Sequence, residues 1–211
     1  MILRFLTRKE RLQMAAYIFV PWMRGDEAQE FIDKSNEWNS VKLILMRSQL
    51  TWDLDDAEAD PRWNQQKFTI VCYGDQVTFA NLSQGDQIYV RGHGRSDSNF
   101  ITGDGMGRFP LNVEQVCERL TKQGLANFTG KIKFYNCESG QSGGKFNTNF
   151  ARSAAKILSQ TNPRCKIYGY KESVSSYYEE GKDGVHKRGK ISGKRASDPT
   201  IREQVFGSKS S

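Results

Sequence analysis

The stretch QIYVRGHG, residues 87–94, decides the fold that the sequence predicts. Its alternating apolar residues are typical of a half-buried β-strand, and the run ends in a Gly-His-Gly turn. KIKFYNCESG, residues 131–140, is a second strand pattern, and it ends in a cysteine and a glycine-containing loop. Between the two, residues 110–125 begin with a proline, carry one apolar stripe at helical spacing and reach Gly124. Strand, helix and strand in this order predict a right-handed crossover between parallel strands.

The following segments continue the alternation. FNTNFARSAAKILSQ, residues 146–160, predicts a second helix, and CKIYGYK, residues 165–171, predicts a further strand. We therefore expect an α/β fold with a mainly parallel central sheet flanked by helices.

The amino-terminal half adds a helix and three strands to this prediction. EAQEFIDKSNEW, residues 27–38, has helical spacing, and VKLILM, residues 41–46, is a compact apolar run that favours a strand. KFTIVCY at residues 67–73 and QVTFANL at residues 76–82 flank a Gly-Asp pair, so we expect them to form a hairpin.

Composition limits the class of protein. With 211 residues, of which 37% are hydrophobic, the chain can bury one core. The net charge of +7 favours an anionic partner, such as a phosphate-rich ligand or a nucleic acid. The four cysteines form no CxxC pair, which indicates reduced thiols in a cytosol-like compartment rather than a disulfide framework or a zinc site.

The amino terminus predicts neither a Sec signal nor a membrane span. Its apolar run, residues 14–23, is interrupted by Pro21 and Trp22, and no small-residue cleavage site follows. It is also far shorter than the roughly 18 apolar residues that a spanning helix needs. If the protein is exported, we expect another route.

A reactive side chain follows each of the two strands predicted in residues 87–94 and 131–140. His93 follows the first strand and Cys137 follows the second, and in a parallel sheet both positions lie at the carboxyl edge, where open α/β folds build their sites. A nearby imidazole can favour the thiolate form of a cysteine and then protonate a leaving amine. We therefore interpret the two residues as a catalytic Cys-His dyad, provided that the two strands are neighbours.

Backbone groups around the dyad complete this hypothesis. Gly94 would let its N–H approach a substrate carbonyl, and the N–H of Cys137 is the second candidate donor to a developing oxyanion. The alternative to a catalytic role is that Cys137 is a buried packing residue and His93 a polar loop residue. Each of the two residues would be interpreted in this way if it occurred alone. His186 is a poorer base candidate, and the remaining cysteines are interpreted as packing residues: Cys72, Cys117 and Cys165.

The combination resembles the caspase-like clan of cysteine peptidases, which includes caspases, clostripain and gingipain. It is most similar to the self-processing cysteine protease domains of MARTX toxins and large clostridial glucosylating toxins. The likeness covers roughly residues 40 to 195 and is carried by four stretches: GDQIYVRGHGRSDSNFITG, KIKFYNCESG, FNTNFARSAAKIL and KIYGYKESVSSYYEEGKDGVHKRGK. The family's catalytic histidine maps to His93 and its nucleophile to Cys137.

The resemblance implies a caspase-like sandwich with a carboxy-terminal β-hairpin flap. We expect residues 1–39 to form an amino-terminal extension with a helix, and residues 40–211 to form the protease domain with a basic flap at about residues 171–195. It also implies a metal-independent endopeptidase that cleaves itself or a host protein.

In the toxin family, inositol hexakisphosphate in the host cytosol activates the enzyme by binding a basic pocket and ordering the flap. A ligand with so many negative charges needs several converging cations. The resemblance places the ligand-binding residues at these positions: Arg62, Lys67, Lys182, Lys187, Arg188, Lys190, Lys194 and Arg195. The alternative for this set is a solvated basic tail.

The sequence departs from the family in two respects. The toxins carry the domain inside very long chains, whereas these 211 residues have no room for a cargo domain. We therefore expect an excised domain or a stand-alone bacterial effector that acts in the host cytosol. Glu138 stands where the toxin domains usually have a small residue, and its charge would oppose thiolate formation beside it. The family's preference for leucine before the cleaved bond is not carried over.

Two other classes of function stay open. The first is a polyanion-binding module for nucleic acid or an inositol phosphate, with a merely structural dyad. Aromatic residues near the basic segment could stack on bases, but no nucleic-acid motif is recognisable, so we do not expect a nucleic-acid partner. The second is a Cys-His acyltransferase or deamidase, which differs only in what attacks the acyl-enzyme.

Overall fold

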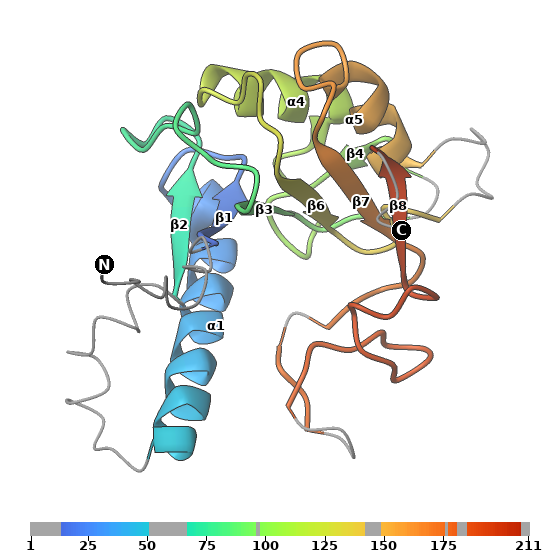
Figure 1. The fold of residues 1–211 in the computed structure, drawn as a ribbon. Helices are drawn as coiled ribbons and strands as arrows, with labels where there is room; N and C mark the ends of the chain where they lie inside the picture. Colours follow the sequence, from blue (N-terminus) through green and yellow to red (C-terminus); the bar gives the residue numbers. More distant parts are fainter. Residues whose placement is uncertain are drawn as a thin grey trace, which may run out of the picture.

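The computed structural model describes residues 14–50, 67–95, 98–141, 149–175, 177–180 and 185–207, with the backbone alone for residues 47–50. Six strands form one central sheet in the order β2-β1-β3-β6-β7-β8 (Figure 1). Their bounds are β1 Ala16–Val20, β2 Phe68–Cys72, β3 Gln87–Arg91, β6 Lys131–Tyr135, β7 Lys166–Tyr170 and β8 Arg202–Phe206. Neighbouring strands are parallel except β7 and β8, which are antiparallel. The predicted α/β class and mainly parallel sheet are confirmed.

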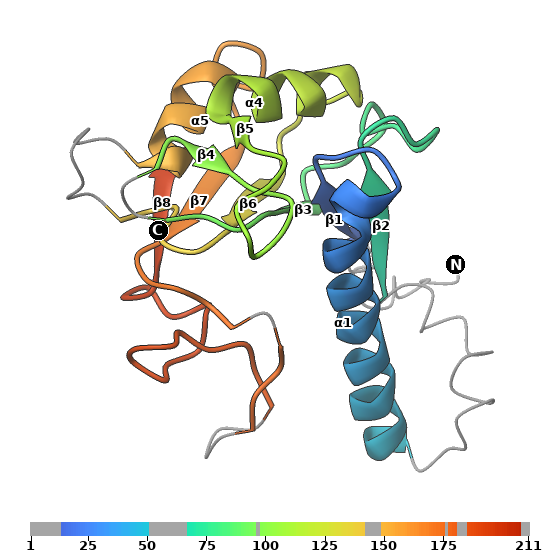
Figure 2. The ribbon, with the colours of Figure 1, turned by 180° about the vertical axis from the view of Figure 1, so that it is seen from behind.

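Helices cover both faces of the sheet. α4 (Val113–Lys122) and α5 (Phe150–Leu158) pack against each other on one face, and α1 (Asp26–Leu50) lies on the other face against β1 and β2 (Figures 1 and 2). A short antiparallel pair, β4 (Phe100–Ile101) and β5 (Leu111–Asn112), precedes α4 in the chain. No helix in the described part of the chain is both long and apolar enough to cross a membrane.

α4 is the helix predicted between the two decisive strands. The side chain of Asn112 accepts a hydrogen bond from the N–H of Gln115 at 2.8 Å, and the side chain of Gln115 accepts one from the N–H of Asn112 at 2.9 Å. This capping box starts the helix just after β5, a few residues later than the predicted start at Pro110. The predicted apolar stripe is buried: Val113, Val116, Cys117 and Leu120.

The strand predicted at residues 41–46 is wrong, because these residues belong to α1. Leu43 and Met46 are buried at helical spacing, whereas Ile44 between them is 56% exposed. A short apolar run without a clear period favours neither structure, and here the preceding helix extends through it. The boundary expected between residues 39 and 40 therefore falls inside one continuous helix.

The predicted hairpin at residues 67–82 is also wrong. β2 pairs in parallel with β1, and residues 76–82 form turns and irregular backbone. Phe79 still contributes to the core, with its ring 5.6 Å from that of Phe19. The strand β1 was not predicted, since Pro21 was interpreted as an interruption of an apolar run, whereas it follows the last residue of a buried strand.

The C-terminal segment, defined as residues 171–201, lies on the same side of the sheet as α1 (Figures 1 and 2). Its described residues contain isolated antiparallel bridges and no named strand. The bridges join Val174 to Gly189, Glu179 to His186 and Arg188 to Arg195.

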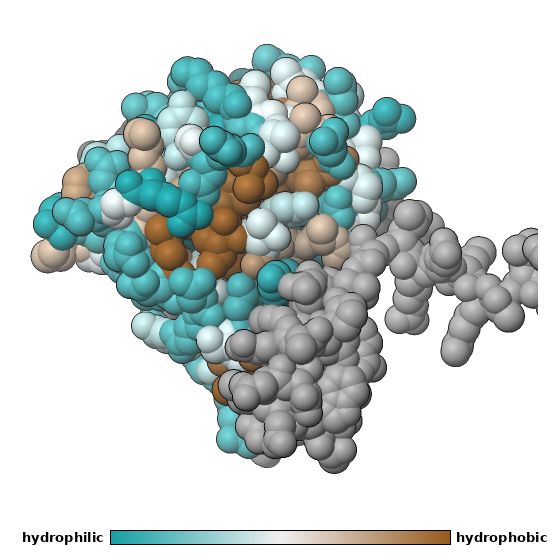
Figure 3. Space-filling view, turned by 90° about the vertical axis from the view of Figure 1, so that its left-hand side faces the viewer, coloured by the Kyte–Doolittle hydropathy of each residue, from teal (hydrophilic) through white to brown (hydrophobic). Residues whose placement is uncertain are grey.

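Figure 3 shows the opposite end of the sheet, where β2 is the edge strand. An apolar patch is exposed there on a mainly hydrophilic surface.

Candidate functional site

The sheet register brings the two predicted reactive residues together. β3 and β6 are parallel neighbours, and their last pair is Arg91 opposite Tyr135. Both His93 and Cys137 stand two residues beyond this pair, so they occupy equivalent positions at the carboxyl edge of adjacent strands. The condition on which the dyad hypothesis depends, that these two strands are neighbours, is met.

Gly94 shows how closely the two turns pack. A Cβ atom at this position would lie 2.8 Å from the carbonyl oxygen of Cys137 and 2.8 Å from Nδ2 of Asn136. Real Cβ atoms do not approach other atoms so closely, so the absence of a side chain at Gly94 allows the loop after β3 to lie directly against the loop after β6.

His93 is held by contacts from three sides. Its backbone forms two hydrogen bonds with Thr102, at 3.0 Å and 2.9 Å. Its ring centroid lies 5.0 Å from that of Phe31 in α1. Its Nε2 lies 2.7 Å from Oε1 of Glu30, one turn from the amino-terminal end of the same helix. The imidazole is therefore oriented by a carboxylate, as general bases commonly are.

The sequence prediction missed Glu30. Its carboxylate also accepts hydrogen bonds from Lys34 Nζ at 2.5 Å and from the N–H of Gly105 at 3.2 Å. Burial opposes ionisation of Glu30, but the hydrogen bonds from Lys34 and His93 outweigh it and lower the pKa of the carboxyl group. An acidic residue in a helix that follows a strand carries no local signal, so only the fold reveals its role.

Cys137 lies in the tight turn that follows β6. Glu138 has a φ of 58°, in the left-handed region, and its backbone turns the chain away from the sheet. The buried hydroxyl of Ser139 donates to the carbonyl of Phe134 at 2.7 Å and accepts from the N–H of Tyr170 at 3.0 Å. These bonds hold the turn that follows β6 against β7. Cys137, which lies in this turn, is partly exposed.

The other cysteines differ from Cys137 in burial. Cys72, Cys117 and Cys165 are all buried, in agreement with their predicted packing role. Burial raises the pKa of Cys72 to about 11, that of Cys117 to about 12 and that of Cys165 to about 12. These thiols are therefore poor nucleophiles at neutral pH, which leaves Cys137 as the accessible thiol.

Two backbone N–H groups near His93 and Cys137 have no acceptor within the described residues. They belong to Gly94 and Cys137, whereas the N–H of His93 is used by Thr102. These are the two groups that the sequence suggests as oxyanion donors. Their availability satisfies one requirement of that role.

A cavity of about 500 Å³ opens beside His93. Its wall combines glycines with apolar and polar side chains from the loops around β4, and Cys137 does not contribute to it. The lining residues are His93, Gly94, Arg95, Ser98, Phe100, Thr102, Asp104, Gly105, Met106 and Gly107.

The described members of the basic set predicted for ligand binding differ in exposure and contacts. Arg62 and Lys182 lie outside the described residues. The following residues are exposed: Lys67, Lys190, Lys194 and Arg195. Arg188 donates to the carbonyl of Gly193 at 3.0 Å, and Lys187 turns inward over the indole of Trp38. The side chain of Lys187 in the C-terminal segment thus points toward the sheet.

A different basic cluster lies on the sheet itself, and the sequence prediction missed it. Lys133 is buried and donates to Gln87 Oε1 at 2.6 Å and to the hydroxyl of Tyr89 at 2.7 Å. Burial, followed by the charges of Arg202 and Lys131, lowers the pKa of Lys133 to about 7. The alternation of strand side chains could have shown that Lys131 and Lys133 share one face.

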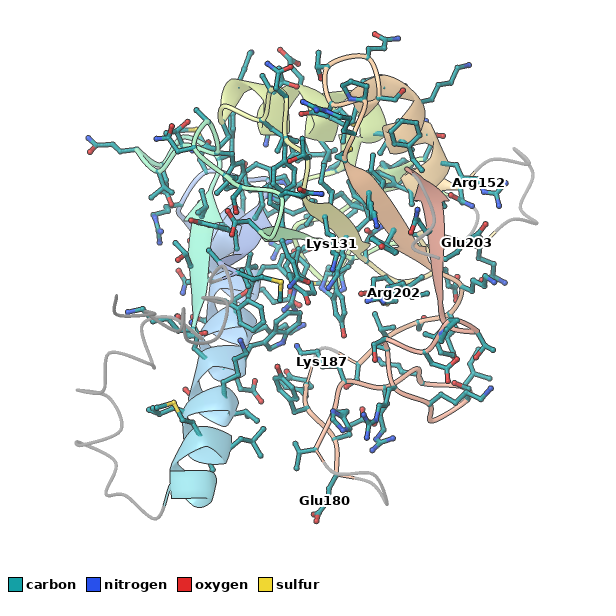
Figure 4. The ribbon with its side chains drawn as sticks, viewed as in Figure 1. Lys131, Arg152, Glu180, Lys187, Arg202 and Glu203 are labelled. Carbon is teal, nitrogen blue, oxygen red and sulfur yellow. The ribbon has the colours of Figure 1, made fainter. Side chains whose placement is uncertain are left out.

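This cluster faces the space beside the C-terminal segment. In the view of Figure 4, Lys131, Arg202 and Lys187 lie between α1 and β8. A second hollow of about 690 Å³ adjoins Arg202, with Tyr168 and Lys171 in its wall. Several cations that repel one another beside a hollow are suited to an anionic ligand.

Neither a family model nor a curated protein identifies this site. Within the described residues, no group of three or more histidine, cysteine or acidic side chains could hold a metal ion. No model of a known protein family matches the chain, and no curated protein matches it.

Proposed function

We propose that the protein is a cysteine endopeptidase in which Cys137 is the nucleophile and His93 the general base. The observation that carries the proposal is the register of β3 and β6, which puts both residues in equivalent positions on one edge of the sheet. The contact of His93 with Glu30 and the partial exposure of Cys137 support it, because this chemistry requires an oriented imidazole and an accessible thiol.

The reaction follows from the groups present. A proton on Nε2 donated to Glu30 leaves Nδ1 of His93 free to take the proton of the Cys137 thiol. The thiolate attacks the substrate carbonyl, and the N–H groups of Gly94 and Cys137 stabilise the oxyanion. His93 then passes its proton to the leaving amine, and water hydrolyses the thioester and restores the thiol.

Activation by inositol hexakisphosphate belongs to the same proposal. The ligand would bind between the sheet and the C-terminal segment, with Lys131, Lys133 and Arg202 joining Lys187. This site differs from the exposed lysines of the segment. Burial and neighbouring positive charges lower the pKa of Lys133 to about 7 and that of Lys187 to about 3, and a multivalent anion bound there would favour the protonated form of both side chains. We further propose that the segment acts as the hairpin flap of a caspase-like fold, in a toxin or effector protease that acts in the host cytosol.

The decisive test is incubation with and without inositol hexakisphosphate, followed by intact-mass measurement and assay on casein. Cys137→Ala and His93→Ala should abolish cleavage, while His186→Ala, at the other histidine of the chain, should retain it. Cleavage by Cys137→Ala at the wild-type rate would remove the proposal.

A polyanion-binding module without catalysis is the second candidate, favoured by the buried cation Lys133. It predicts a thermal shift with inositol hexakisphosphate but no cleavage of any substrate. An acyltransferase or deamidase would retain the thioester chemistry and transfer the acyl group to an acceptor other than water, which product analysis by mass spectrometry distinguishes.

A further inference from the structure

The cavity beside His93 lies on one side of the proposed dyad. His93 and Gly94 contribute to its wall, and Cys137 does not. In the proposed reaction, the sulfur of Cys137 bonds to the substrate carbonyl carbon, and His93 passes its proton to the nitrogen that leaves. The part of the substrate that departs with this nitrogen therefore lies nearer to the imidazole than to the thiol. The cavity is in the position that this departing part would occupy.

Two large apolar side chains are exposed in the wall of the cavity. Phe100, the first residue of β4, is 48% exposed, and Met106 is 75% exposed. Single exposed apolar residues are common on protein surfaces, but two that line the same cavity indicate a binding surface for an apolar group. The cavity volume of about 500 Å³ lies within the range of small-ligand pockets, so a large side chain can enter it.

Polar side chains of the same wall form hydrogen bonds within the protein. The hydroxyl of Ser98 donates to the carbonyl of Phe100 at 3.0 Å. The hydroxyl of Thr102 donates to the carbonyl of Asp104, also at 3.0 Å. The carboxylate of Asp104 accepts from the N–H of Arg108 at 2.8 Å and from its Nε at 2.5 Å. A polar side chain of a substrate would have to compete with these bonds, whereas an apolar one would not.

Met106 lies in a turn that is anchored beside the base. Its N–H donates to Oδ1 of Asp104 at 3.1 Å. The N–H of Gly105 donates to Oε2 of Glu30 at 3.2 Å, while Oε1 of the same carboxylate lies 2.7 Å from Nε2 of His93. One carboxylate thus contacts both the base and the turn, and it sets the position of the turn relative to the imidazole. A wall that is ordered in advance selects a side chain at little cost in conformational entropy.

We propose that this cavity binds the residue after the cleaved bond, and that Phe100 and Met106 select a large apolar side chain there, such as leucine, methionine or phenylalanine. The inference rests on the proposed peptidase function and names a feature of its substrates. The residue before the cleaved bond is the competing occupant, and the position of Cys137 outside the wall favours the residue after it. An acidic side chain is the competing chemistry, because the exposed Arg95 is also in the wall.

The test first digests casein with the full chain in the presence of inositol hexakisphosphate. Mass spectrometry of the fragments identifies the residues on both sides of each cut. One cleaved sequence is then made as four internally quenched peptides that differ only after the cut, where they carry leucine, glycine, aspartate or lysine. The wild-type protein should cleave the leucine peptide with the highest kcat/KM, about 10-fold or more above the glycine peptide.

Variants of Met106 test the assignment to this cavity. Met106→Ser removes apolar surface at an exposed position and should lower the leucine-to-glycine ratio of kcat/KM by about 5-fold. Met106→Glu adds a carboxylate to the wall and should raise the lysine-to-leucine ratio by about 5-fold or more. Met14→Ser is the matched control, since Met14 is 52% exposed and precedes β1, at the opposite edge of the sheet from the dyad. Both ratios should stay at their wild-type values in this control.

The outcomes separate this inference from the proposed function. Cleavage of neither casein nor any peptide overturns both. A wild-type protein that cleaves the glycine, aspartate or lysine peptide at least as well as the leucine peptide overturns the apolar subsite and leaves the peptidase standing. A leucine preference that Met106→Ser does not reduce overturns the assignment to this cavity. A casein digest by Met106→Ser in which only the preference before the cut changes would assign the cavity to the other side of the substrate and would also overturn the inference.

Discussion

Oε1 of Glu30 lies 2.7 Å from Nε2 of His93, and this contact joins the first turns of α1 to the loop after β3. The two residues are far apart in the sequence, and their meeting depends on α1 crossing the sheet from the end of β1. A carboxylate in this position favours the tautomer that carries its proton on Nε2, so α1 orients the imidazole that we propose as the general base.

Replacement of Glu30 by alanine should lower kcat by about 10²-fold with a smaller change in KM, because the imidazole loses its orientation. Steady-state kinetics at a fixed pH measures kcat and KM separately. Asp33→Ala is the matched control, since Asp33 lies on the same helix and bonds only to Gln29 on the exposed surface. Equal losses in the two variants would contradict the positioning role.

Replacement of Lys133 by methionine should stabilise the fold below neutral pH. The pKa of Lys133 falls from 10.5 to about 7 on folding, so the unfolded chain binds the extra proton between these values and wild-type stability rises with pH across that range. At pH 6 the variant avoids the cost of burying the charge and should be more stable by about 1 to 4 kcal/mol. The gain should shrink toward pH 10.5, which urea unfolding at several pH values detects. A gain that is the same at every pH would argue against a buried charge.

The cations on the sheet should govern polyanion binding. Lys131→Gln combined with Arg202→Gln removes two charges, each of which contributes about 1.5 to 3 kcal/mol in a charge-assisted hydrogen bond. The thermal shift with inositol hexakisphosphate should then largely disappear. The control pair is Lys190→Gln with Lys194→Gln, which removes two exposed charges from the C-terminal segment. A larger loss in the control pair would place the ligand on the segment instead.

Substitution of Gly94 by alanine should disturb the packing between the two catalytic turns. The new Cβ would meet the carbonyl of Cys137 and the side chain of Asn136 at 2.8 Å, which predicts a destabilisation of about 1 to 3 kcal/mol by overpacking. Gly105→Ala is the control, because its nearest contact is His93 Nε2 at 4.0 Å. Urea unfolding compares the two, and equal stabilities would show that the turns can separate without cost.

The spacing of apolar residues and the turn residues that follow them were enough to predict the strands and helices with regular patterns. The strands before His93 and Cys137 were predicted because their runs are short, apolar and followed by glycine-containing turns. α1 was cut short, because residues 41–46 have too few polar neighbours to show a period. β1 was not predicted. Its pairing with both β2 and β3 depends on contacts between residues that are distant in the sequence.

Some residues of the candidate site could be predicted from the sequence, and others could not. His93 and Cys137 could be found because each follows its own strand, and strand ends meet at one edge of a parallel sheet. Glu30 could not, since its contact with His93 depends on where α1 lies. The basic segment was overestimated for a related reason: charge shows in a sequence, but the direction of a side chain does not.

Three side chains of α1 act on different parts of the site. Glu30 contacts the imidazole of His93, Phe31 lies against both His93 and Arg91, and Trp38 lies beside Arg91 and Lys187. Because the three residues lie on one helix, a shift of α1 along its axis would displace all three contacts at once. A neighbouring domain or an inhibitor that pushes on this helix would therefore disturb the proposed dyad from a distance.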